Sequence, residues 1–147
     1  MVSKITPTLV VIAIAGLFLT VITSAALSDS DMFALNGTIS TAGVDAYTDA
    51  ACTIPATALN VGNLAPGSAV TQTIYIKNNG TIPVTLSMAP SNWNPTTASS
   101  YLTLSWNRGS YVLASGGSVQ ATLTLTAAAS TGSLTTFSCT VTITGTE

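Results

Sequence analysis

The residue types that carry most enzyme chemistry are scarce in this chain. It contains no histidine, so the usual triads that activate a serine or cysteine nucleophile cannot be built. It also contains no HExxH motif and no Cys/His cluster of the kind that binds zinc. We therefore predict a non-enzymatic protein with no catalytic residue, no metal ion and no cofactor.

The few carboxylates offer one alternative to this prediction. Asp29, Asp31, Asp45 and Asp49 could together surround a calcium ion, which accepts carboxylate and carbonyl oxygens. Their spacing differs from that of an EF-hand loop, which leaves solvated loop aspartates as the simpler interpretation.

The aromatic residues Trp93, Trp106, Tyr101 and Tyr111 could form a platform for a carbohydrate. Trp106 is in phase with neighbouring apolar residues, so its simpler role is to fill a core. Trp93 lies in a predicted loop, where either role is open.

Two cysteines, Cys52 and Cys139, fit a protein of an oxidising exterior. If bridged, they close a loop of roughly 90 residues, which contributes about 4–5 kcal/mol in the chain-entropy model. We predict this disulfide; the alternative is two buried thiols, because Cys139 falls in a core-facing phase.

Two Asn-x-Thr sequons, at Asn36 and Asn79, are candidate glycosylation sites. Asn79 is the better candidate, because Asn79-Gly80 between two strands predicts an exposed tight turn.

The low number of charged residues limits the kinds of partner that this protein can bind. The chain has 3 basic and 5 acidic residues, which argues against nucleic acid, because nucleic-acid binding needs a basic patch. Thr and Ser together make up more than a quarter of the chain. With so little charge to keep copies apart, we expect a surface that is covered by sugars, that associates, or both.

The front of the chain has the pattern of an export signal. Lys4 precedes an apolar run of about 14 residues from Leu9 to Ile22, and Ser24-Ala25-Ala26 follows. This run is shorter than the ~20 residues of a membrane span. We predict a hydrophobic signal helix over residues 1–26 that is cleaved near Ala26; the alternative is a retained anchor helix over residues 5–27.

The rest of the chain alternates with period two, which predicts β-strands. Apolar residues alternate mainly with threonines, and Pro-Gly, Asn-Gly and Gly-Gly pairs separate the segments. We predict an all-β fold, an antiparallel Ig-like or jelly-roll β-sandwich over residues 44–147. The expected strands cover residues 44–47, 57–61, 70–77, 82–88, 102–106, 119–126 and 136–144.

A separate alternating segment, Phe33 to Ile39, precedes this domain, within an N-terminal segment of residues 27–43. Its apolar residues Phe33, Leu35 and Ile39 surround Gly37, which would allow close approach. A flexible link over residues 40–43 would let the strand leave its own domain. The alternative is an ordinary first strand folded into its own sheet, because the same residues would pair identically in both places.

Two stretches of the sequence carry a family resemblance. They are Leu64-Ala65-Pro66-Gly67-Ser68-Ala69-Val70 and the segment from Ile74 through Lys77-Asn78-Asn79-Gly80 to Val84. They resemble the "L-x-PG-x-x-V … K-N-x-G" core of TasA/camelysin-type biofilm fibre proteins and, more closely, of archaeal bundling-pilus and thread subunits. The resemblance covers residues 44 to 147.

This resemblance implies a secreted structural subunit whose copies form an extracellular filament by donor-strand complementation. In such a filament the N-terminal strand of one copy completes the sandwich of the next, and filaments can bundle laterally. Phe33, Leu35, Gly37 and Ile39 would form the donor strand. Because no histidine is present to hold zinc, the peptidase activity associated with camelysins is not carried over.

Two other functions remain open at the level of sequence. A type IV pilin-like subunit would retain its N-terminal helix, although Lys4 lacks the Gly or Ala usual after that cleavage point. A membrane-anchored adhesion module would instead bind through Trp93 and neighbouring aromatic residues. In the filament prediction the membrane is involved only during export.

Overall fold

The computed structural model describes residues 33–147, and at a few positions of the first strand it describes the backbone alone. The predicted signal helix and the two aspartates at positions 29 and 31 lie outside the described residues. The first strand belongs to the same compact unit as the rest of the described chain, although the sequence predicted a domain beginning at residue 44.

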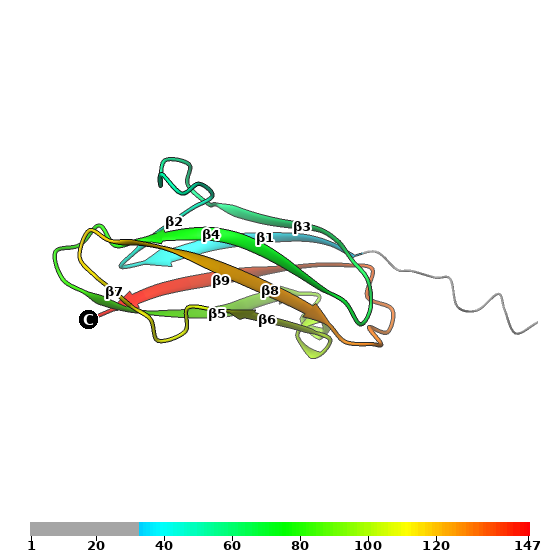
Figure 1. The fold of residues 1–147 in the computed structure, drawn as a ribbon. Helices are drawn as coiled ribbons and strands as arrows, with labels where there is room; N and C mark the ends of the chain where they lie inside the picture. The colour runs from blue at the N-terminus through cyan, green and yellow to red at the C-terminus, as the bar shows by residue number, and fades with distance from the viewer. Residues whose placement is uncertain (1–32) are drawn as a thin grey trace, which may run out of the picture. The chain divides into compact units, whose positions relative to one another are not determined.

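The described residues are nearly all β-structure and form two sheets, as predicted for a β-sandwich (Figure 1). The five-stranded sheet has the order β3-β1-β9-β5-β7 and the four-stranded sheet the order β2-β4-β8-β6. The elements are β1 (Phe33–Ala42), β2 (Asp45–Tyr47), β3 (Ala58–Leu64), β4 (Ala69–Lys77), β5 (Val84–Asn94), the 3-10 helix η2 (Thr96–Ser100), β6 (Leu102–Trp106), β7 (Val112–Leu113), β8 (Ser118–Ala127) and β9 (Thr136–Thr146).

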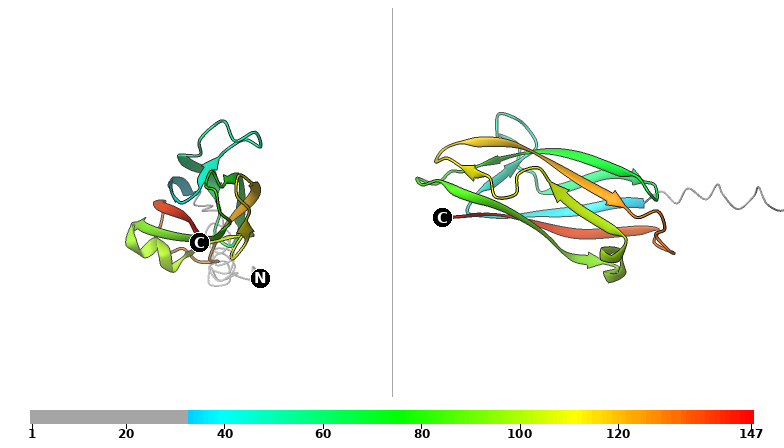
Figure 2. Two further views of the ribbon diagram at one scale, coloured as in Figure 1. Left: turned by 90° about the vertical axis from the view of Figure 1, so that its left-hand side faces the viewer. Right: turned by 60° about the horizontal axis from the view of Figure 1, so that its bottom comes forward.

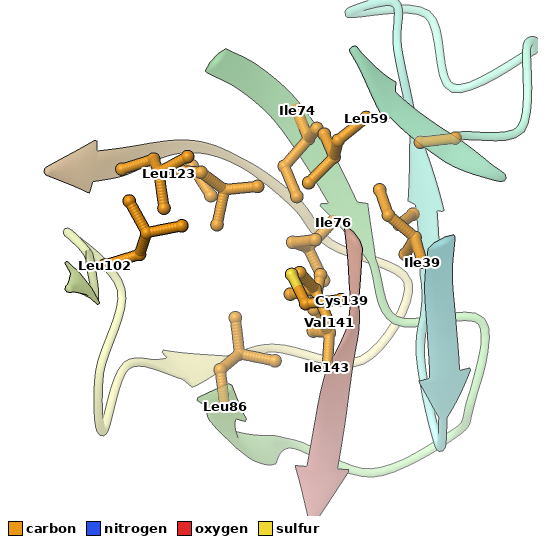
Figure 3. Close-up of a cluster of buried hydrophobic side chains, with 14 of the residues drawn as sticks. Ile39, Leu59, Ile74, Ile76, Leu86, Leu102, Leu123, Cys139, Val141 and Ile143 are labelled. Atoms are coloured by element: carbon orange, nitrogen blue, oxygen red, sulfur yellow. The ribbon is translucent and has the colours of Figure 1, made fainter. Parts of the chain in front are cut away.

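Alternating side chains from the two sheets fill the space between them. In β9 every second residue is buried: Phe137, Cys139, Val141 and Ile143 point inward, and threonines or serines alternate with them. Ile74 and Ile76 of β4 and Leu123 of β8 approach from the other sheet (Figure 3). Leu125 of β8 is buried as well. Threonine on the outer face suits a strand because its β-branched side chain favours extended backbone without adding charge.

All neighbouring strands are antiparallel except one pair. β1 and β9 run in the same direction, toward the end of the domain that holds the C-terminus (Figures 1 and 2). The prediction of a purely antiparallel arrangement was therefore wrong for this pair. β1 and β9 are the first and last of the described strands, so no short turn joins them and none forces them to be antiparallel.

Candidate functional site: the place of strand β1

The first strand lies inside the five-stranded sheet, between β3 and β9. It pairs with β9 at every position from Ala34 opposite Thr136 to Ala42 opposite Thr144. On its other side it pairs with β3, from Phe33 opposite Leu64 to Thr38 opposite Ala58. We call this place between β3 and β9 the β1 slot, and we name its ends the Thr136 end and the Thr144 end.

The β1 slot holds together parts of the sheet that otherwise do not meet. β3 is an edge strand of the five-stranded sheet, and among the described strands β1 is its only neighbour in that sheet. The sequence left two places open for this strand, in its own sheet or in the sheet of a neighbouring copy. In the single chain, the strand lies in its own sheet. Exchange of the strand between copies stays a prediction.

Gly37 and Ile39 are β1 residues whose side of the strand is buried. Ile39 is 9% exposed and packs into the core beside Leu59 of β3 (Figure 3). The backbone positions of Phe33 and Leu35 lie opposite Leu64 and Phe137. Their side chains lie outside what the structure describes.

In the single chain, the surroundings of Gly37 leave room for a side chain. A Cβ atom added there would lie 3.5 Å from Leu59 Cβ and 3.7 Å from the Cys139 carbonyl oxygen, which are ordinary contact distances. An apolar cavity lies beside it, lined by Gly37, Leu59, Val61 and Cys139 together with residues of β4, β6 and β8. The space in this cavity that the centre of a water-sized sphere can reach is about 10 Å³. This volume is barely enough for one water molecule.

The connection from β1 to the rest of the domain is short. The link predicted over residues 40–43 was wrong in extent, because residues 40–42 belong to β1 and only Gly43 and Val44 separate it from β2. Gly43 has a φ of +72°, which favours glycine, and a Cβ there would collide with the carbonyl oxygen of Gly145. This turn therefore packs tightly against the end of β9.

A surface hollow adjoins the β1 slot at its Thr144 end. Its volume is about 280 Å³, and its lining includes Ile39, Thr41, Tyr47, Pro55 and Ala56. Thr41 is exposed although it alternates in phase with the buried Gly37 and Ile39. This end of the slot is therefore less well filled than its centre.

The predicted disulfide is not formed, because Cys52 and Cys139 are both free thiols. Cys139 lies in β9, faces the core and is 5% exposed, and burial raises its pKa. Cys52 lies in the loop between β2 and β3, partly exposed, with its sulfur 4.0 Å from the carbonyl oxygen of Ala50. One thiol faces the interior and the other lies on an outer loop, so the prediction of a bridge was wrong and its alternative holds for Cys139.

The two sequons have different surroundings. Asn79 is exposed in the loop between β4 and β5, as predicted, and its side-chain amide donates to a carboxylate oxygen of Asp45. Asn36 lies within β1, where its backbone is opposite Ser138 on one side and Asn60 on the other. Asn79 thus lies in an exposed loop, whereas the backbone of Asn36 is part of a strand that is paired on both sides.

The described aspartates stabilise loops. Asp49 accepts hydrogen bonds from the backbone N–H groups of Ile54 (2.7 Å) and Thr53 (2.9 Å) and from the Thr53 hydroxyl (2.8 Å). The hydrogen bond from Ile54 is the main cause that lowers the pKa of Asp49 below its ordinary value. Over residues 33–147, no group of three or more potential metal ligands comes together. The calcium alternative therefore gains no support from Asp45 and Asp49.

The aromatic residues are spread over the domain. Trp93 packs against Phe137, with ring centroids 6.3 Å apart, and lies in β5 where the sequence predicted a loop. Trp106 is partly buried against the core, as its phase predicted. Tyr111 is 40% exposed beneath the guanidinium of Arg108, 5.1 Å from its ring centre. Within residues 33–147, the rings that pack together are those of Trp93 and Phe137, so the alternative of a sugar platform formed by Trp93, Tyr101, Trp106 and Tyr111 gains no support.

Asn78 is a buried polar residue outside the β1 slot that the sequence did not single out. It is completely buried, and its side-chain amide donates to the carbonyl oxygens of Ile82 (2.8 Å), Leu113 (3.2 Å) and Ala114 (3.3 Å). Its side-chain oxygen accepts from the Gly80 N–H at 2.9 Å. The signal was present, because Asn78 continues the inward alternation of Ile74 and Ile76.

Asn78 also lies in the Lys77-Asn78-Asn79-Gly80 motif that carries the family resemblance. Comparisons with protein-family models and with curated proteins found no match to this chain. The resemblance to TasA/camelysin-type proteins stays a prediction. Within residues 33–147, no helix has the length and apolar character to cross a membrane.

Proposed function

We propose that this chain is the structural subunit of an extracellular filament, in which β1 of one copy fills the β1 slot of the next. The observation that supports this most is the position of β1. It is the first of the strands that the structure describes, it is paired along both edges, and only Gly43 and Val44 connect it to β2. A strand that precedes all others in its domain can be exchanged without unthreading any of them.

An empty β1 slot would be strongly unfavourable, which gives the exchange its driving force. Without β1, the facing edges of β3 and β9 would have no partner in the slot, and such edges are templates for another strand. The apolar side chains of Leu59 and Val141 would also gain exposure, at a cost of about 1.5–3 kcal/mol for each one fully uncovered. An identical strand from a second copy satisfies both requirements through main-chain pairing and side-chain contacts.

Several features of the sequence support the same function. The export-type leader fits a secreted protein that reaches the cell surface after cleavage near Ala26. The scarcity of charge removes most of the repulsion that keeps soluble domains apart. The resemblance to bundling-pilus subunits adds an Ig-like or jelly-roll topology and a homopolymer without catalytic activity. Asn79 is the position we propose for a surface glycan.

Strand exchange is tested by changing β1 alone. Filaments are examined by electron microscopy for the natural chain, for a deletion of residues 33–39 and for Ile39→Asp. We expect filaments only from the natural chain, because a buried carboxylate at position 39 would be strongly disfavoured. Thr38→Ser, at an exposed position one residue away, is the matched control and should assemble normally.

Deletion could also prevent folding, so a second measurement is needed. A synthetic peptide of residues 33–39, the segment that was removed, is added to the deletion variant. We expect the peptide to restore a folded monomer that does not polymerise, because the peptide is not joined to another domain. Filaments from the deletion variant alone would refute strand exchange.

A further inference from the structure

We infer that β1 must reverse its direction when it passes from its own sheet to a neighbouring copy, so that it runs antiparallel to β9 in the filament. This inference rests on the proposed function and specifies the geometry of the same slot. It follows from the direction of β1 and from the shortness of its connection to β2.

Both the connection and the C-terminal ends of β1 and β9 lie at the Thr144 end of the slot. Ala42 is opposite Thr144, and Gly43 and Val44 lead directly into β2. Two residues span at most about 7 Å. A β1 strand that leaves its slot therefore remains attached to its own domain at the Thr144 end, and the slot that receives it must lie close to that end.

Transfer in the original direction would close the assembly. The C-terminus of the incoming strand would again lie at the Thr144 end of the receiving slot, so the Thr144 ends of the two domains would face each other. The receiving copy's own β1 would emerge at that same contact, next to the empty slot of the donor. The two strands would exchange reciprocally, which gives a two-fold dimer that cannot grow.

Transfer in the reversed direction leaves the assembly open. The C-terminus of the incoming strand then lies at the Thr136 end of the receiving slot, so the Thr144 end of one domain meets the Thr136 end of the next. The receiving copy's own β1 remains free at the far end to enter a third copy. A head-to-tail contact of this kind generates a filament.

The sequence of β1 tolerates this reversal because its apolar pattern is nearly symmetric about Gly37. Leu35 and Ile39 lie two residues before and two residues after Gly37. If Gly37 stays opposite Cys139, reversal exchanges the positions of Leu35 and Ile39. Reversal about Gly37 places each odd-numbered residue of β1 where another odd-numbered residue was. The alternation of inward and outward side chains is therefore preserved.

The hollow at the Thr144 end gives the reversed strand an advantage. Reversal about Gly37 moves Phe33 to the position that Thr41 now occupies, opposite Ile143. That position borders the 280 Å³ hollow formed with Tyr47, Pro55 and Ala56. An aromatic ring there would bury apolar surface that a threonine leaves exposed.

Paired cysteines distinguish the two directions. Ser40 lies opposite Thr142 in the single chain, whereas reversal about Gly37 places it opposite Thr136. These two positions in β9 are six residues apart, or about 20 Å, far beyond the reach of one disulfide. Ser40→Cys/Thr142→Cys and Ser40→Cys/Thr136→Cys are therefore matched variants, each made together with Cys52→Ser and Cys139→Ala.

Each variant is oxidised as a monomer and as a filament, then separated by denaturing electrophoresis without reductant. As a monomer, only the Ser40/Thr142 variant should form an intrachain bridge, which also reports correct folding. In filaments, only the Ser40/Thr136 variant should give a ladder of covalently joined copies, which reduction removes.

The other outcomes separate this inference from the proposed function. If filaments of the Ser40/Thr142 variant give the ladder, or if filaments of neither variant do, the reversal is wrong. The filament function would still stand in both cases. A different result would be folded chains that give only a covalent dimer through the Ser40/Thr142 pair, with no filaments from any variant or from the natural chain. That result would overturn both the reversal and the proposed filament function.

Discussion

Replacing Gly37 by alanine should stabilise the single chain. Gly37 lies in the interior of β1, and its φ is not among the positive values of the domain. A Cβ there meets only ordinary contacts, with Leu59 Cβ nearest at 3.5 Å, and it borders the apolar cavity between the sheets. The new methyl group therefore fits without moving its neighbours.

Two contributions set the size of the effect. Burying one methyl group against Leu59 and Cys139 contributes about 0.8 kcal/mol. Restricting the unfolded chain by replacing glycine contributes a further 0.4–1 kcal/mol, roughly. The free energy of unfolding should thus rise by about 1–2 kcal/mol.

Urea denaturation of the monomer measures this change. With an m-value of about 2 kcal/mol/M, the midpoint should rise by about 0.5–1 M. Gly145→Ala in β9 is the matched control, because its Cβ would lie 2.7 Å from Val44 Cγ1 and 2.8 Å from Val84 Cγ2. Overpacking at that position should lower stability by about 1–3 kcal/mol.

An unchanged or lowered midpoint for Gly37→Ala would refute this reasoning. An unchanged midpoint would mean that Gly37 is as exposed in the folded monomer as in the unfolded chain, so that β1 does not occupy its own slot. A lowered midpoint would mean that the cavity beside Cys139 has less room than the contact distances indicate.

Three further predictions concern side chains around the slot and the loops. Asn78→Ala should lower the free energy of unfolding by about 2–4 kcal/mol in urea denaturation, because the buried Leu113 carbonyl loses the donor on Asn78 and the Gly80 N–H loses its acceptor; a loss below about 0.5 kcal/mol would contradict it. In the native chain a thiol-specific reagent should label Cys52 and leave Cys139 unmodified until urea unfolds the domain, which mass spectrometry of peptides can check. Asp49, whose pKa is lowered in the folded state, should contribute stability above the ordinary pKa of 3.8 and lose it as the pH falls through the folded value. The difference in urea midpoint between the natural chain and Asp49→Asn should therefore be present at about pH 7 and shrink below pH 3.8; a difference that does not change with pH would rule out a role for the ionised carboxylate.

The alternation of apolar and threonine residues was sufficient to predict most of the strands. The segments expected at 70–77, 102–106, 119–126 and 136–144 correspond to β4, β6, β8 and β9 within one or two residues. The strand expected from residue 82 begins at Val84 instead, after Pro83. β7, which has only Val112 and Leu113, is too short to produce a periodic pattern.

The site was harder to predict than the strands because it depends on which segments become neighbours. Alternation in residues 33–39 identified a strand but could not reveal that β9 lies beside it in parallel, since the two are separated by most of the chain. The same lack of local information explains the wrong prediction of a bridge between Cys52 and Cys139, which are both free thiols. Gly43 illustrates the limit most clearly, because its role depends on the backbone of Gly145.

The pairing of β3 and β9 with a strand in the β1 slot does not by itself choose between the single chain and the proposed filament, because a strand of the same sequence would fill the slot in both. The choice depends on the connection. In the single chain, β1 is held beside its own slot by two residues, so its effective concentration there is high. The turn at Gly43, packed against Gly145, exists only in that arrangement. In the proposed filament these advantages would be lost, and the reversed strand would gain contact at the hollow beside Tyr47 and Pro55. The proposal therefore predicts a folded monomer at low concentration, where the edges of β3 and β9 are paired with their own β1, and a polymer when neighbouring copies are abundant.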